Sequence, residues 1–149
     1  VEKIELDPEL PVFLRAQLLH YPNPQRISIE VTVNNALENL AVFSDFATFC
    51  KSLNIGITLD HFELSSCDLE QILALPVDAI KVSGNVMQDI EKNSALYQSL
   101  LSLFQQASSS NIILIAEHIE QLEVLEAMKN LGFRYAQGFY LSKPKSNLE

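Results

Sequence analysis

The sequence lacks features that mark several common classes of protein. Its apolar runs are far shorter than the ~20 residues that cross a bilayer, so we expect no direct membrane insertion. Its two cysteines, Cys50 and Cys67, are too few for a disulfide scaffold or a zinc site and predict free thiols in a reducing compartment. Val1 opens no signal segment, so we expect a cytoplasmic domain, while a membrane anchor elsewhere in a longer parent chain stays open.

Basic residues are also scarce. The chain carries 10 Lys and Arg against 19 Asp and Glu, which gives a formal net charge of −9. This balance opposes binding to a nucleic-acid backbone, so we expect no nucleic-acid partner. A small anionic nucleotide can still bind where metals, backbone amides or a single lysine supply local positive charge.

Alternating strand and helix patterns fill the chain. With 149 residues and 48% hydrophobic content, residues 1–149 fit one globular domain. Apolar residues at helical spacing predict helices after Asp7-Pro8, from a cap at Asn34 or Asn35 to Leu53, and before Gly132. Strands are predicted at residues 27–33, 55–61, 77–83, 112–117 and 135–139, which implies a parallel sheet with right-handed crossovers.

The strand patterns favour a barrel over an open sheet. Residues 27–33 and 55–60 alternate apolar with polar side chains, whereas central strands covered on both faces are nearly continuous apolar runs. A closed barrel of this class has eight strands. The sequence therefore predicts an α/β fold, a TIM-like (β/α) barrel that is incomplete in this chain, whose exposed edge an upstream segment or another chain would cover.

Each predicted strand ends in a polar residue. The C-terminal ends of parallel strands meet at one mouth of a barrel, where active sites are built. The residues at these ends are Glu30, Asp60 with His61, Lys81, Glu117 and Gln137. Carboxylates suit Mg²⁺, Mn²⁺ or Ca²⁺, and a lysine can neutralise a phosphate, so the set predicts metal-assisted phosphodiester chemistry. Each residue alone would be interpreted as a solvated strand end; five in one place weaken that interpretation.

Four ordered segments resemble the EAL domain family over essentially the whole chain. Residues 60–63 and 75–81 are similar to its Asp-Asp-Phe-Gly and its Leu-Pro-Val-Asp with a following Ile-Lys. Residues 117–120 are similar to Glu-Gly-Val-Glu, and residues 137–144 to Gln-Gly-Tyr/Phe with a later proline. Together these matches are specific, and they correspond to the C-terminal part of such a domain.

The resemblance implies a function and a set of site residues. An active family member cuts cyclic di-GMP to the linear dinucleotide with two Mg²⁺ or Mn²⁺ ions. By this resemblance Glu30 and Asp60 would be metal ligands, with His61 beside them, and Lys81 would hold water or phosphate. Glu117 would be the base or a metal-proximal carboxylate. The residues implied in ligand contact are Lys81, Glu120, Gln137 and Gly138.

Departures from the family pattern predict that this site is vestigial. His61 replaces the second aspartate, Val33 replaces the glutamate that anchors the loop over the metals, and His118 replaces a glycine. The loop at 63–67 also lacks the family's glycines, and Ser83 replaces an aspartate. Two-metal catalysis depends on its bridging ligands. We therefore expect Glu30, Asp60 and His61 to hold no metal, no cofactor in this form, and Mg²⁺ or Mn²⁺ only if activity remains.

Two functions from different classes remain open. The first is a catalytically inactive EAL-type domain in cyclic di-GMP signalling, either a nucleotide receptor or a protein-interaction module whose partner is another protein or a second EAL chain. The alternative is a weakly active metal-dependent cyclic di-GMP phosphodiesterase with one altered metal. An unrelated α/β domain is disfavoured by the ordered motifs.

Overall fold

A parallel sheet of five strands organises the protein. The computed structural model describes residues 9–18, 20–64, 69–86 and 94–143. The strands follow one another across the sheet in chain order, and every neighbouring pair is parallel. They are β1 (Ser28–Thr32), β2 (Gly56–Phe62), β3 (Ala79–Ser83), β4 (Ile113–Glu117) and β5 (Tyr135–Ala136). The predicted parallel α/β arrangement is confirmed.

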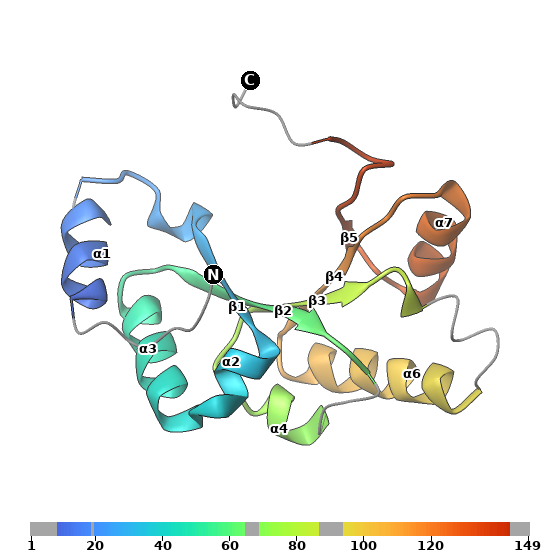
Figure 1. Ribbon diagram of the computed structural model, residues 1–149, viewed down its shortest axis with the longest axis horizontal. Coiled ribbons are helices and arrows are strands. Elements are labelled where there is room, and N and C mark those ends of the chain that lie inside the picture. The colour runs from blue at the N-terminus through green and yellow to red at the C-terminus, as the bar shows by residue number, and fades with distance from the viewer. Residues whose placement is uncertain (1–8, 19, 65–68, 87–93, 144–149) are drawn as a thin grey trace.

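Helices connect the strands and cover one face of the sheet. They are α1 (Leu10–Leu18), the 3-10 turn η1 (Pro24–Arg26), α2 (Val33–Glu38), α3 (Leu40–Ser52), α4 (Leu69–Leu73), α6 (Ser94–Ser109) and α7 (Leu122–Leu131). Figure 1 shows α2, α3, α4 and α6 gathered on the same side of the sheet. Consecutive parallel strands need such crossovers, and one-sided cover is the arrangement of a barrel wall.

The two faces of the sheet differ in chemistry. The side chains of Leu59, Ile80 and Ala116 point toward the helices and are fully buried. Successive strand residues alternate in direction, so the neighbouring polar residues point to the opposite face. There the hydroxyls of Ser28 and Thr58 are 2.7 Å apart across β1 and β2. In a closed barrel this second face would be the interior.

The helix predicted from Asn34 or Asn35 to Leu53 is two helices. The Thr32 hydroxyl accepts a hydrogen bond from the backbone N–H of Asn35 at 3.4 Å and caps α2, so the predicted cap is wrong. Asn39 then caps α3 by accepting from the N–H of Val42 at 3.2 Å. Asparagine side chains compete with helical backbone hydrogen bonds in this way. The apolar spacing hid the break because it continues on both sides of Asn39.

The last predicted strand is shorter than expected. It was predicted over residues 135–139, but regular pairing ends at Ala136. Two residues later Gly138 has a φ of +155°, a conformation that turns the chain away from the strand. The predicted stop at Gly132 is confirmed, because Gly132 adopts a left-handed conformation with φ +108° after α7.

Several other sequence predictions can be compared with the structure. Cys50 is a fully buried free thiol, and burial raises its pKa to about 11. Cys67, the predicted start at Asp7-Pro8 and the segment at 87–93 lie outside the described residues. Within the described ranges, every helix is too short or too polar to cross a bilayer.

Candidate functional site

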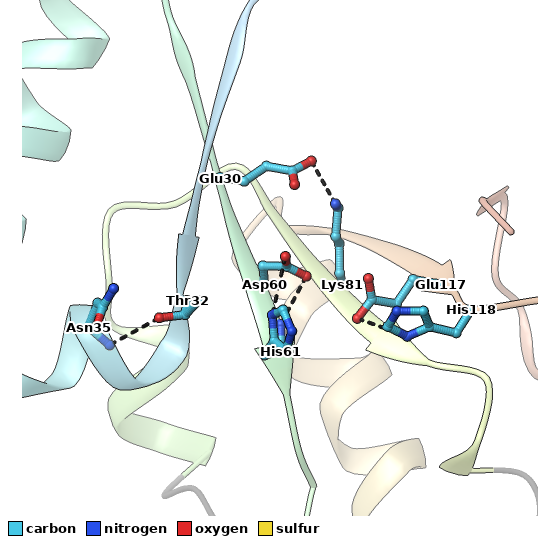
Figure 2. Close-up of polar contacts among 8 residues, drawn as sticks. All are labelled: Glu30, Thr32, Asn35, Asp60, His61, Lys81, Glu117 and His118. Carbon is cyan, nitrogen blue, oxygen red and sulfur yellow. Dashed lines mark hydrogen bonds and ion pairs between the residues drawn. The ribbon is translucent and has the colours of Figure 1, made fainter. Parts of the chain in front are cut away.

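Four side chains meet on the open face of the sheet, and we call them the strand-end cluster: Glu30, Asp60, Lys81 and Glu117. Figure 2 shows them converging from four strands. The ammonium of Lys81 lies 2.6 Å from the Glu30 carboxylate, although β2 separates their strands. Thr58 stands opposite Glu30 on β2, on the strand between Glu30 and Lys81. The lysine side chain is 6% exposed and the glutamate 52%.

The two remaining members of the cluster are a pair of neighbouring carboxyl groups. Burial raises the pKa of Glu117 above its ordinary value, and the negative charge of Asp60 and a hydrogen bond with it raise this pKa further. The positive charges of His118 and Lys81 act in the opposite direction. Glu117 thus lies in a buried, acidic environment that a single lysine only partly neutralises.

Two histidines follow the carboxylates directly and share an unusual backbone conformation. His61 has a φ of +57° and His118 a φ of +55°. Each ring lies beside its preceding carboxylate, with Nδ1 to oxygen distances of 3.3 Å for His61 and Asp60 and 3.7 Å for His118 and Glu117. This left-handed conformation costs most residues ~1–2 kcal/mol, and glycine adopts it freely. This cost gives a physical reason for the glycine that the family has at the position of His118.

The donor atoms of the cluster make contacts with neighbouring side chains. Throughout the ranges that the structure describes, no three His, Cys, Asp or Glu side chains are grouped as a metal site. The Glu30 carboxylate binds Lys81, and His61 is 69% exposed with its ring turned toward its own neighbour, Asp60. Bridging two ions requires carboxylates that converge on them. The metal-ligand roles of Glu30, Asp60 and His61 stay predictions.

A pocket of about 430 Å³ opens next to β5, and we call it the β5 pocket. Its volume falls within the range of small-ligand sites. The residues that line it include His118, Glu120, Gln137, Gly138, Phe139 and Lys143. Three of these were predicted to contact ligand, whereas Lys81 belongs to the strand-end cluster instead. Phe139 and Lys143 were missed, and the only sign of them was their place in the motif at 137–144.

Gly138 closes the wall of the β5 pocket. The Ile119 N–H donates to the Gln137 carbonyl at 3.1 Å, and the Tyr140 N–H donates to the Ile119 carbonyl at 3.0 Å. Between these hydrogen bonds, a Cβ on Gly138 would lie 2.2 Å from the Ile119 carbonyl oxygen and 2.3 Å from its nitrogen. Only glycine permits this approach. The position was predicted to contact ligand, and its geometry gives it a structural role as well.

Fold and site together define the C-terminal portion of a (β/α) barrel with acidic residues at its mouth. The model of the EAL domain family matches residues 5–144, and the chain belongs to this family. The structural neighbours are EAL domains, whose barrel is TIM-like and is incomplete in this chain. The predicted fold class is therefore confirmed.

Individual relatives agree with this assignment. The chain is 32% identical over 135 residues to the cyclic di-GMP phosphodiesterase PdeA of Borreliella burgdorferi, an alignment that covers 90% of the chain and 20% of that protein. It is 28% identical over 120 residues to the cyclic di-GMP phosphodiesterase PdeF of Escherichia coli, covering 80% and 16%. The chain thus spans a fifth or less of these two curated relatives.

Solved structures match the fold over most of the chain. The FimX EAL domain from Pseudomonas aeruginosa bound to c-di-GMP superimposes with a TM-score of 0.82 at 22% identity, covering 95% of this chain and 59% of that one. The EAL domain of Mycobacterium smegmatis DcpA superimposes with a TM-score of 0.79 at 19% identity, covering 94% and 63%. At these identities the likeness concerns the fold.

Proposed function

We propose that this EAL domain binds cyclic di-GMP as a receptor without hydrolysing it at a useful rate. The observation that carries the proposal is the β5 pocket, which borders the strand-end cluster through His118 and brings together Glu120, Gln137 and Gly138. Family membership and relatives named cyclic di-GMP phosphodiesterases support the ligand class.

The side chains of the β5 pocket suit a purine nucleotide. Guanine has N–H groups on its Watson–Crick edge that could donate hydrogen bonds to the Glu120 carboxylate. The flat face of the guanine could stack on Phe139. Phe139 is 62% exposed, so its ring is available for stacking. Lys143 supplies a positive charge for a phosphate. Each of these contacts would serve to bind the nucleotide, and none of them requires a metal ion.

The arrangement of the strand-end cluster supports the absence of useful turnover. A hydrolytic centre needs carboxylates free to hold cations and a lysine free for the phosphate or water. Glu30 and Lys81 instead bind each other, and the position of the second family aspartate holds His61, which is a poor exchange for a carboxylate on Mg²⁺.

The test measures binding and turnover in the same samples of the full-length protein. Calorimetric titration with cyclic di-GMP in chelator, Mg²⁺ and Mn²⁺ should give micromolar affinity in each, and chromatography should recover the ligand intact. An active family member serves as the positive control for hydrolysis. Turnover comparable to that control would refute the proposal, and failure to bind would favour a role in protein interaction.

The weakly active phosphodiesterase is tested by one substitution. His61→Asp returns the family residue to β2, and restored Mg²⁺-dependent hydrolysis in the full-length protein would show that this position alone limits turnover. We expect no restoration, because Glu30 would still bind Lys81 and Val33 would still stand where the family has its loop-anchoring glutamate.

A further inference from the structure

Glu30 occupies the place that an anionic ligand would take on Lys81. The ammonium of Lys81 is almost wholly buried on β3, and an ion pair joins it to a Glu30 oxygen at 2.6 Å (Figure 2). Carboxylate and phosphate oxygens are equivalent acceptors for an ammonium group. A phosphate that reached Lys81 would therefore have to displace Glu30 or share the ammonium with it.

We propose that Glu30 is an internal competitor that holds Lys81 until an anionic ligand takes its place, and we call this ion pair the Glu30–Lys81 latch. The inference rests on the proposed function, because it concerns how the same domain admits a nucleotide phosphate. It gives Glu30 a role opposite to the metal-ligand role that the resemblance implied, since a ligand of the metal would promote nucleotide binding.

The two partners of the latch differ in their freedom to move. Half of the Glu30 side chain is exposed, so its carboxylate can turn into water at little cost, as exposed ion pairs generally can. Lys81 is buried within the sheet and cannot follow it. Exchange of partners at Lys81 therefore moves the glutamate and leaves the lysine in position.

Displacement of Glu30 would also act on the edge of the sheet. β1 pairs with β2 alone among the described strands, and Thr32, two residues after Glu30, caps α2. Movement of the backbone at Glu30 would therefore reach the cap of α2. We expect ligand binding to change amide exchange in residues 28–35, and the same change without ligand when Glu30 is replaced.

The decisive variants are Glu30→Gln and Glu30→Ser in the full-length protein, with Glu38→Gln as the charge-matched control. Glu38 is an exposed residue at the end of α2. In chelator, both Glu30 variants should bind cyclic di-GMP about three- to tenfold more tightly than the wild type, because the Glu30–Lys81 ion pair no longer has to be broken. The control should bind as the wild type does.

Every outcome separates the latch from its alternatives. Unchanged or weaker binding by both folded Glu30 variants, with a wild type that binds, would overturn the latch and leave the receptor proposal intact. Weaker binding that appears only in Mn²⁺ or Mg²⁺ would assign Glu30 to a metal and overturn the latch. No binding by any variant would overturn both proposals.

Discussion

The strand-end cluster and the β5 pocket lie at the same end of the sheet but use their polar atoms in opposite ways. In the cluster, Glu30 and Lys81 bind each other, and Asp60 shares a hydrogen bond with Glu117. In the pocket, Glu120 and Lys143 border an open volume instead. The cluster pairs its one ammonium internally, whereas the pocket leaves its charged groups bordering open space.

Under the proposed function, the two regions differ in what their chemistry demands. Hydrolysis by two metals needs several carboxylates at defined separations. A single replacement, such as histidine for aspartate at position 61, would therefore disturb the whole set of ligands. Binding in a pocket depends mainly on a few contacts, and many of the surrounding contacts contribute little. Substitutions in the two regions should therefore have different consequences.

The largest effect is expected from closing the pocket wall. Gly138→Ala places a Cβ against the Ile119 backbone, which should lower the free energy of unfolding by about 3 kcal/mol or more and abolish nucleotide binding. Gly132→Ala is the matched control, since its Cβ would meet only a Phe104 side-chain carbon at 3.6 Å and the cost is conformational, about 1–2 kcal/mol. Urea unfolding of both variants measures the difference. Equal losses of unfolding free energy in the two variants would show that backbone conformation alone, and not the approach to Ile119, accounts for the effect at Gly138.

A smaller effect should separate binding from stability. Phe139→Ala removes an exposed ring from the β5 pocket, so cyclic di-GMP affinity should fall about tenfold or more while the free energy of unfolding changes by less than about 0.5 kcal/mol. Tyr97→Ala, which removes an exposed ring from α6, should leave affinity unchanged. Unchanged affinity in Phe139→Ala would argue that the nucleotide binds elsewhere.

The smallest effect is a pH dependence that belongs to the cluster. Because the pKa of Glu117 is raised in the folded state, its stabilising contribution is present at low pH and is lost as pH rises from the unfolded value of about 4.5 through the folded value. Glu117→Gln should therefore gain stability relative to the wild type as pH increases over this window. Urea unfolding at several pH values measures the gain, with Glu120→Gln in the pocket as the charge-matched control. The same gain in both variants would contradict the assignment to Glu117.

Much of the fold was predictable because it depends on local patterns. Alternation placed β1 to β4 within about two residues of their observed limits, and Gly132 marked the end of α7 because a left-handed position favours glycine. The break at Asn39 was missed because two helices that pack on one sheet keep a common apolar spacing. The early end of β5 was missed because it depends on the approach of Gly138 to Ile119.

The sequence predicted most of the residues that gather at the site, but not which of them bind one another. Strand-end positions brought Glu30, Asp60, Lys81 and Glu117 together, since parallel strands end at one mouth. Gln137 was predicted in the same set and lines the β5 pocket instead. No spacing rule shows that Glu30 reaches across β2 to Lys81, because that contact depends on where the side chains lie on the folded sheet. Nor did the sequence separate the pocket beside β5 from the cluster.

The order of strands, the family and the residues at the strand ends follow from the sequence alone, because hydrophobic period and motif order are properties of the chain. Which of those residues bind one another, and which face an open pocket, was decided by the tertiary structure. Hydrogen bonds and ion pairs act over a few ångströms, and only packing brings residues that are distant in the chain within that range.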